Sequence, residues 1–197
     1  MQKLALFDFD GTLTRKDTLF EIIIYIHGRR RFYLGMIYLL PFILLYKIKF
    51  LKNWQVKQKC LVYFFAGMPY DYFQAKCERF STERLPYLLR NDAMKTFNKL
   101  KNGGVRTIIV TASAENWVKP WCDVQNTECI ATKLEIKEGK LTGMINGENC
   151  HGIEKVLRIK NTVNLSQYSS IEAYGDSSGD IPMLALATKP HYKKFHS

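Results

Sequence analysis

The most constraining feature of the sequence is an apolar run near its start that ends in two aspartates and a glycine, LALFDFDGTLT at residues 4–14. The run is too short for a helix, so it predicts a buried central strand that opens into a loop. Asp8 and Asp10 lie two residues apart, on one face of an extended chain. Two ionised carboxylates beside an apolar sheet repel each other unless a cation or a proton intervenes. They could therefore share a divalent metal; in the alternative reading, Asp10 only belongs to a turn and Asp8 is a cap.

The length and composition favour a globular protein with one domain and a substantial insertion, because 47% of the 197 residues are hydrophobic. The five cysteines form an odd set without C-x-x-C spacing, which indicates neither a disulfide framework nor a zinc site. Such cysteines are typical of a reducing compartment. The first residues lead directly into the predicted strand, without the features of a signal peptide, so we expect a cytoplasmic protein.

The net charge of +11 is unevenly distributed. No acidic residue lies between Glu21 and Asp71, whereas this segment contains eight basic residues, Arg29, Arg30, Arg31, Lys47, Lys49, Lys52, Lys57 and Lys59. A field of one sign attracts an anionic partner, which could be a phosphorylated substrate, a nucleic acid or an anionic lipid surface. The alternative is a basic face that only keeps the protein in solution.

Residues 32–46 (FYLGMIYLLPFILLY) carry no charge and are flanked by basic residues. As a helix they would reach only about 22 Å, less than the hydrocarbon core of about 30 Å, which argues against a simple crossing. The pattern suits a helix that lies in the lipid headgroup region, or a hairpin buried within a helical subdomain. We expect residues 15–88 to form an all-helical insertion.

The remaining sequence alternates strand and helix patterns. The β-branched run at residues 105–111 predicts a central strand, followed by a helix that starts at Ser113 or Ala114, and residues 134–145 predict a hairpin. Hydroxyl groups and free amides at such a strand end suit a phosphate, although a hydroxyl there is more often only a cap. Alternating elements predict an α/β fold with a doubly wound parallel sheet, formed by residues 1–14 and 89–197.

Two further polar clusters follow in this core. Lys155 lies near the start of a predicted helix, where the helix dipole disfavours a cation, so it needs an anionic partner unless it is a solvated surface lysine. Asp176 and Asp180 follow a short predicted strand at residues 171–174. In a doubly wound sheet, ligands bind at the carboxyl ends of the strands, where all these polar clusters fall.

Taken in order, DFDGTLT, IIVTAS, the lysine of CHGIEKV and YGDSSGD resemble the four motifs of the haloacid dehalogenase-like (HAD) phosphohydrolases, over nearly the whole chain. The resemblance implies a Rossmann-like core with a helical cap inserted after the first strand. This cap closes over the site and selects the substrate. The second aspartate of the first motif is absent from dehalogenase relatives, so its presence points to phosphoryl transfer.

The resemblance also assigns the chemistry. Asp8 would be the nucleophile that forms an aspartyl phosphate, and Asp10 the general acid and base. A carboxylate nucleophile and a phosphoryl group repel each other, so a hard cation is needed, and Mg²⁺ suits oxygen ligands. The implied metal ligands are Asp8, the backbone carbonyl of Asp10, and Asp176, with Asp180 holding a water on the metal.

The implied phosphate-binding residues are Thr111, Ala112 and Ser113, which would hold phosphoryl oxygens, and Lys155, which would neutralise charge near Asp8 and the phosphate. Asp17 falls where phosphoserine phosphatases place an acid that binds the substrate amine, unless it only caps the following helix. The chain resembles their branch of the family, but Thr111-Ala112-Ser113 replaces a serine followed by two glycines, and GDSSGD replaces a GDGxND-like loop.

The charge-free segment with basic flanks, together with CHGIEKV, is more similar to the bacterial phosphatidylglycerophosphatases of this superfamily. This similarity implies a lipid phosphomonoester as substrate and peripheral attachment to the inner face of an anionic membrane. The alternative within the family is a small soluble phosphomonoester.

Two hypotheses from other classes remain. A nucleic-acid binder could use the basic insertion, but the basic residues surround an aliphatic run and no recognisable motif accompanies them. A non-catalytic HAD-like module that binds phosphate or a protein partner is opposed by the intact set of motif residues. The sequence indicates neither the leaving group nor the oligomeric state.

Overall fold

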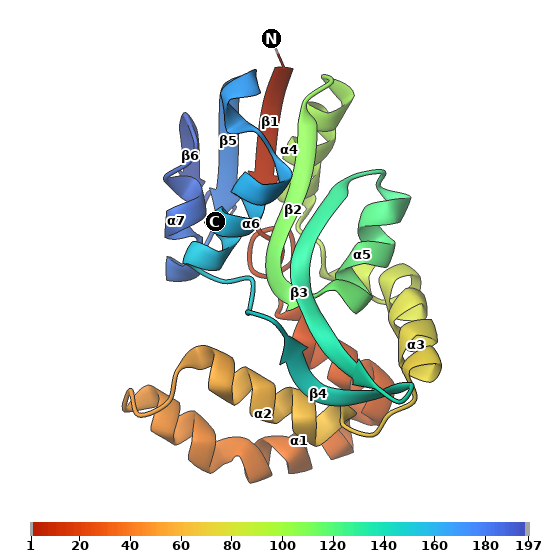
Figure 1. The fold of residues 1–197 in the computed structure, drawn as a ribbon. Coiled ribbons are helices and arrows are strands. Elements are labelled where there is room, and N and C mark those ends of the chain that lie inside the picture. Colours follow the sequence, from red (N-terminus) through yellow and green to blue (C-terminus); the bar gives the residue numbers. More distant parts are fainter. Residues whose placement is uncertain (1, 196–197) are drawn as a thin grey trace.

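The fold is built on one six-stranded sheet with the strand order β4-β3-β2-β1-β5-β6 (Figure 1). The computed structural model describes residues 2–195. All neighbouring strands are parallel except β3 and β4, which form an antiparallel hairpin. This arrangement confirms the predicted α/β class. The strands are β1 (Gln2–Phe7), β2 (Arg106–Ala114), β3 (Glu128–Lys137), β4 (Lys140–Asn146), β5 (Tyr168–Gly175) and β6 (Lys189–Tyr192).

Strand β1 lies in the interior of the sheet, between β2 and β5. Its side chains are apolar on both faces, as is typical of a central parallel strand. Leu4 and Leu6 pack into one hydrophobic cluster, and Ala5 and Phe7 into the other. All four are fully buried. The period of two along a strand divides them in this way, and helices cover both faces (Figure 1). The apolar run that precedes Asp8 therefore holds the site at the middle of the sheet.

The helices of the first half of the chain are α1 (Thr18–Lys47), α2 (Asn53–Phe65), α3 (Tyr70–Glu83), η1 (Leu85–Leu88) and α4 (Asn91–Asn102). Those of the second half are α5 (Glu115–Val124), α6 (Ile153–Thr162), η2 (Leu165–Gln167), η3 (Ser178–Asp180) and α7 (Ile181–Leu184). One predicted boundary is wrong. Strand β2 continues through Ala114, and α5 begins only at Glu115, because the strand carries its pairing with β3 as far as Ala114.

Helices α1 and α2 form a lobe at the end of the sheet where β1 leads into the site (Figure 1). Helix α1 leaves helical dihedrals at Gly28 (φ 79°, ψ 162°), so it consists of two segments joined at that residue, with Pro41 inside the second. A Cβ atom on Gly35 would lie 2.2 Å from Cζ of Phe64, so glycine is needed where α1 crosses α2. The hairpin also supports the lobe, since the amide of Gly67 donates to the carbonyl of Leu141 at 2.8 Å.

An ion-pair cluster fastens the start of α1 to the neighbouring segments. Glu21 accepts from Lys16 at 3.0 Å and from Arg84 at 2.9 Å. Partial burial opposes the charge of Glu21, but the hydrogen bonds from Lys16 and Arg84 hold its pKa below the ordinary range. The indole of Trp117 on α5 donates to the hydroxyl of Thr18 at 3.0 Å. These contacts fix the chain where it leaves the sheet.

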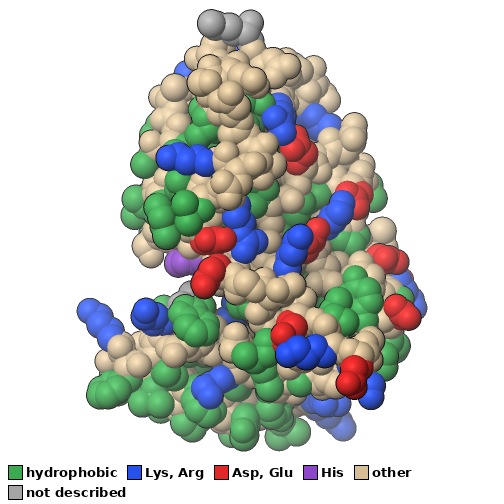
Figure 2. Space-filling model, in the orientation of Figure 1, with side chains coloured by type: hydrophobic (Ala, Val, Ile, Leu, Met, Phe, Trp, Pro, Cys, Tyr) green, Lys and Arg blue, Asp and Glu red, His purple; other side chains and the backbone are tan. Residues whose placement is uncertain are grey.

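The second segment of α1 exposes a continuous set of large apolar side chains. Leu34, Ile37 and Tyr38 are 65%, 68% and 60% exposed, whereas Leu39 on the other side of the helix is buried. Figure 2 shows apolar side chains gathered over this lobe, with Lys and Arg side chains among and around them. Only the inner side of the segment is buried, so the hypothesis of a hairpin buried within a helical subdomain fits that side alone. Within residues 2–195, no helix has the length and apolar character needed to cross a bilayer.

Candidate active site

The end of β1 places two carboxylates in different surroundings. Asp8 is 6% exposed, and its main-chain amide donates to the carbonyl of Tyr174 on β5 at 2.9 Å. The carboxylate of Asp10 is held from two sides, because it accepts from the amide of Thr18 at 2.8 Å and from the hydroxyl of Ser113. The structure thus orients Asp10 toward the start of α1 and the end of β2, whereas Asp8 lies against the sheet.

Lys155 is a buried cation, not a solvated surface lysine. Its side chain extends from the first turn of α6 and the residue is only 1% exposed. Its ammonium group donates to Asp8 at 2.6 Å, to Asp180 at 2.6 Å and to the carbonyl of Val110 at 2.8 Å. Burial opposes its charge, but the two carboxylates raise the pKa of Lys155, so it stays protonated. Three acceptors therefore use the three donors of this ammonium group.

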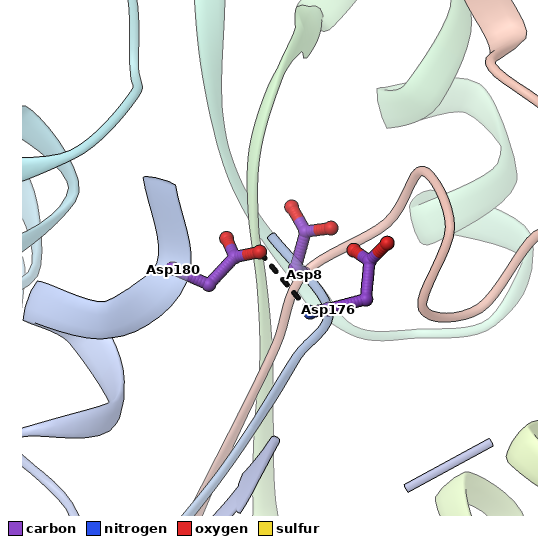
Figure 3. Close-up of side chains that lie close together, drawn as sticks. All are labelled: Asp8, Asp176 and Asp180. Carbon is purple, nitrogen blue, oxygen red and sulfur yellow. Dashed lines mark hydrogen bonds between the residues drawn. The ribbon is translucent and has the colours of Figure 1, made fainter. Parts of the chain in front are cut away.

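Asp8, Asp176 and Asp180 form an acidic cluster, in which one carboxylate oxygen of each lies within 4.8 Å of the others. Figure 3 shows the three side chains close together: Asp8 comes from the end of β1, Asp176 from the segment after β5, and Asp180 from the helical turn that follows. The hydroxyl of Thr12 lies between two of them, 3.3 Å from both Asp8 and Asp176. Asp180 also accepts from the amide of Asp176 at 3.2 Å. The acids predicted from separate motifs thus meet at one place.

Gly11 allows this close approach. Its φ of +80° lies in the left-handed region, and a Cβ atom there would lie 2.3 Å from a carboxylate oxygen of Asp176. Any other residue would be strained by its backbone and would also displace Asp176.

The charges of the cluster fit a divalent cation. When Asp8, Asp176 and Asp180 are all ionised, Lys155 offsets one of their three negative charges and two remain in a largely buried space. Burial raises the pKa of Asp8 to about 7, against the opposing effect of Lys155. Oxygen ligands with an uncompensated charge of this size suit Mg²⁺. Both oxygens of Asp180 are already engaged, one by Lys155 and the other by the main chain and by Ser177, which agrees with an indirect role toward a metal.

The residues predicted to hold the phosphate lie at the end of β2. Thr111, Ala112 and Ser113 all line the same pocket as Asp8 and Asp10. They lie at the end of the strand, and α5 begins after them at Glu115 and not at Ser113 or Ala114. The amide of Ser113 donates to the hydroxyl of Thr111 at 3.0 Å. The pairing of β2 with β3 is irregular between Val110 and Ala114, which is the segment that contains these three residues.

The pocket has a volume of about 570 Å³ and two chemically different parts. One part contains the motif residues, and the other is lined by apolar side chains of the helical lobe, Leu19, Phe20, Met36, Leu39, Ile43, Tyr46, Val56 and Cys60. Asp17 lines the pocket at the start of α1, where it also caps the helix by accepting from the amide of Leu19 at 2.9 Å. Burial, together with the Asp10 carboxylate, raises the pKa of Asp17 to about 6.

Sequence reasoning did not assign three residues of the pocket or its walls. Thr12 lies within the first motif, and only the fold shows that it bridges two acids. Asn149 and Lys57 line the pocket, and Nζ of Lys57 is 3.1 Å from the side-chain oxygen of Asn149. These two residues are 92 positions apart, so no local pattern could pair them.

The profile of the haloacid dehalogenase-like hydrolases matches residues 5–185 of this sequence. The chain belongs to this family. Protein CicA of Caulobacter vibrioides is 31% identical over 194 residues, which cover 98% of the chain and 86% of CicA. Membership of the HAD-like hydrolases confirms the expectation of a hydrolytic enzyme.

Solved structures of other proteins share the fold. A Bordetella pertussis protein of unknown function superposes with a TM-score of 0.82 at 23% identity, covering 96% of this chain and 89% of that one. A phosphoserine phosphatase in its apo form superposes with a TM-score of 0.67 at 21% identity, covering 98% and 86% of the two chains. At these identities the likeness establishes the HAD-like architecture, and the activity has to be argued from the site.

Proposed function

We propose that the protein is a Mg²⁺-dependent phosphomonoester hydrolase that works through an aspartyl phosphate on Asp8. The observation that carries the proposal is the cluster of Asp8, Asp176 and Asp180, two of which, Asp8 and Asp180, share the Lys155 ammonium group. Asp10 lines the same pocket. This set provides a carboxylate nucleophile, a second carboxylate for proton transfer, and an anionic cluster that requires a cation.

In the first step, an oxygen of Asp8 bonds to phosphorus while the bond from phosphorus to the ester oxygen breaks. Asp10 gives its proton to the departing oxygen, which leaves as an alcohol. In the second step, water attacks the phosphorus of the aspartyl phosphate and Asp10 takes the proton from that water. The bond between Asp8 and phosphorus breaks, which releases inorganic phosphate, restores the carboxylate of Asp8 and leaves Asp10 protonated, as it was at the start.

The surrounding residues hold these groups in place. Thr18 and Ser113 each bond one oxygen of Asp10, so its carboxylate keeps a fixed direction during proton transfer. Lys155 reduces the charge of Asp8 as an anionic phosphoryl group approaches. We assign Mg²⁺ to Asp8, Asp176 and the backbone carbonyl of Asp10, where it would neutralise the charge that the nucleophile and the phosphoryl group share.

We further propose that residues 15–88 act as a cap and that the substrate is a lipid phosphomonoester such as phosphatidylglycerophosphate. The pocket supports this choice because its motif residues adjoin an apolar wall, which suits a ligand with a phosphate at one end and hydrocarbon at the other. The exposed face of α1 and its basic surroundings would bind the cytoplasmic surface of an anionic membrane. Each basic residue near such a surface contributes about 1 kcal/mol.

The test compares Mg²⁺-dependent phosphate release from phosphatidylglycerophosphate in mixed micelles with release from glycerol phosphate and from phosphoserine. Asp8→Asn is the blank, since an amide cannot form the aspartyl phosphate. A strong preference for the lipid is expected. Equal or faster release from a soluble ester would reject the lipid substrate and leave a phosphatase of small metabolites. Absence of release from all three would reject the hydrolase itself.

Membrane binding has its own test. Ile37→Glu places a charge in the middle of the exposed α1 face, and sedimentation with anionic vesicles should show binding weakened by about tenfold, the value of one buried aliphatic side chain. Ile153→Glu is the matched control, because Ile153 is similarly exposed (65%) but lies on α6. Equal vesicle binding by the two variants would reject the α1 face as the membrane contact.

A further inference from the structure

A second lysine, Lys57, lies partly buried in the pocket, at the boundary between the helical lobe and the sheet. Lys57 extends from α2, and its Nζ donates to the carbonyl of Ala112 on β2 and to the side-chain oxygen of Asn149 at 3.1 Å. Its side chain lines the same pocket as Asp8 and Asp10. Lys57 therefore reaches from the apolar wall to the edge of the motif residues.

Both hydrogen-bond partners of Lys57 are neutral. Within the part of the chain that the structure describes, no carboxylate forms an ion pair with it. Burial lowers the pKa of Lys57, and the more distant carboxylates of Asp17 and Asp10 oppose this effect. An ammonium group has three donors, and two of them are used here. A partly buried cation whose hydrogen-bond partners are neutral oxygens is suited to receive an anion that enters from the pocket.

The partners of Lys57 are themselves held in place. The hydroxyl of Thr132 donates to the carbonyl of Ala112 at 2.7 Å and also lies 3.1 Å from the side-chain oxygen of Asn149. The amide of Cys150 donates to the same hydroxyl at 3.0 Å. The two acceptors of Lys57 thus belong to one hydrogen-bonded network that joins β2, β3 and the loop before α6. A preorganised donor loses little conformational entropy when it binds a ligand.

We propose that Lys57 is a specificity-determining residue that binds a second anionic group, located in the leaving-group part of the substrate. The proposal rests on the hydrolase function for the position of the phosphomonoester beside Asp8. Lys155 cannot serve this second group, because protein acceptors already use its three donors. Lys57 lies between the motif residues and the apolar wall, so the second anion would lie between the phosphomonoester and an apolar tail.

Two chemistries could supply this anion, a phosphodiester or a carboxylate. The experiment measures ligand binding by calorimetry in excess Mg²⁺, using the Asp8→Asn protein so that no turnover occurs. Three soluble ligands share a phosphomonoester: glycerophosphoglycerol phosphate adds a phosphodiester, 3-phosphoglycerate adds a carboxylate, and glycerol 3-phosphate adds no second anion. All three lack acyl chains, so binding to a membrane does not contribute.

The variants are Lys57→Met, which removes the charge but keeps an unbranched chain, and Lys57→Arg, which keeps the charge. Lys59→Met is the matched control, since Lys59 lies on the same helix, loses the same charge, and instead stacks over the ring of Phe42. We expect Lys57→Met to lower the affinity for a ligand that carries a second anion by about tenfold, equivalent to about 1.4 kcal/mol. The affinity of Lys57→Met for glycerol 3-phosphate should equal that of the unsubstituted lysine protein. The Lys57→Arg and Lys59→Met proteins should keep the preference for ligands with a second anion.

The outcomes separate the proposal from a purely structural role. If Lys57→Met weakens only the phosphodiester ligand or only the carboxylate ligand, the proposal holds and the anion is identified. If Lys57→Met lowers the affinity for all three ligands equally, or for none of them, Lys57 only connects α2 to the sheet and the proposal is overturned. Phosphate release by the wild-type protein is measured separately. Without release, the hydrolase function fails even where the Lys57-dependent binding difference persists.

Discussion

Replacing Lys155 by methionine tests the electrostatic account of the site. Lys155 is 1% exposed and is the direct ion-pair partner of Asp8 and Asp180, which are themselves 6% and 1% exposed. Methionine keeps the length of the side chain, so the main loss is the charge and its hydrogen bonds. Breaking a buried ion pair from one side costs about 3 to 5 kcal/mol. We expect the free energy of unfolding to fall by this amount at pH 8 without Mg²⁺.

The pH dependence of this loss has a defined sign. Burial raises the pKa of Asp8 from 3.8 to about 7, so its ionisation opposes folding increasingly as the pH rises toward 7. Lys155 reduces that penalty in the wild-type protein. At pH 5, Asp8 of the Lys155→Met protein can take up a proton instead of remaining an uncompensated anion. The destabilisation should therefore be smaller at pH 5 than at pH 8.

Urea unfolding monitored by circular dichroism gives these free energies. Lys160→Met is the control, because Lys160 is exposed on the same helix and its loss should change stability by no more than about 0.5 kcal/mol. Mg²⁺ should restore part of the stability of Lys155→Met, since a bound cation compensates the same carboxylates. A loss below about 1 kcal/mol at pH 8, or a loss that does not depend on pH, would refute the reasoning.

Three further predictions follow from the same geometry. Gly11→Ala should destabilise the protein by about 1 to 3 kcal/mol and weaken Mg²⁺ activation by displacing Asp176. Gly104→Ala shares the positive φ but contacts nothing within 4 Å, so an equal effect on Mg²⁺ activation would contradict this explanation. Glu21→Gln should cost about 1 kcal/mol at pH 7. The pKa of Glu21 in the folded protein lies below its ordinary value of 4.5. The difference in unfolding free energy between Glu21→Gln and the wild type, measured with urea, should therefore persist as the pH falls to about 4.5 and vanish at lower pH. A difference that does not change with pH would exclude the ion pairs as its cause. Chelation of Mg²⁺ should abolish phosphate release and lower the melting temperature, and readdition should restore both; activity that survives chelation would reject the metal assignment.

The central strand and the fold class could be predicted because they depend on local patterns. A short apolar run ending at Asp8 has few alternatives to a buried strand, and alternating elements imply a parallel sheet. The end of β2 could not be predicted in the same way. Thr111 to Ser113 have residue types that suit either a strand end or a helix start, and pairing with β3 decides in favour of the strand.

The acids of the site were predictable as a set, since each follows a predicted strand and such strand ends meet at one edge of a parallel sheet. The burial of Lys155 could be suspected from its unfavourable position near a helix start. Its simultaneous pairing with Asp8 and Asp180 depends on side-chain directions across three elements. Asp17 left two hypotheses open; the structure shows the helix cap, and a role in substrate binding stays a prediction.

The sequence by itself determined the order of the elements, the chemical types at the strand ends and the concentration of basic and apolar residues between Glu21 and Asp71. These features depend on neighbours along the chain, through side-chain periodicity and backbone preference. Only the tertiary structure decided which α1 side chains face solvent, that Asp180 shares Lys155 with Asp8, and that Lys57 meets Asn149 in the pocket. Such contacts join residues that are far apart in sequence, and their distances are set by how helices and strands pack together.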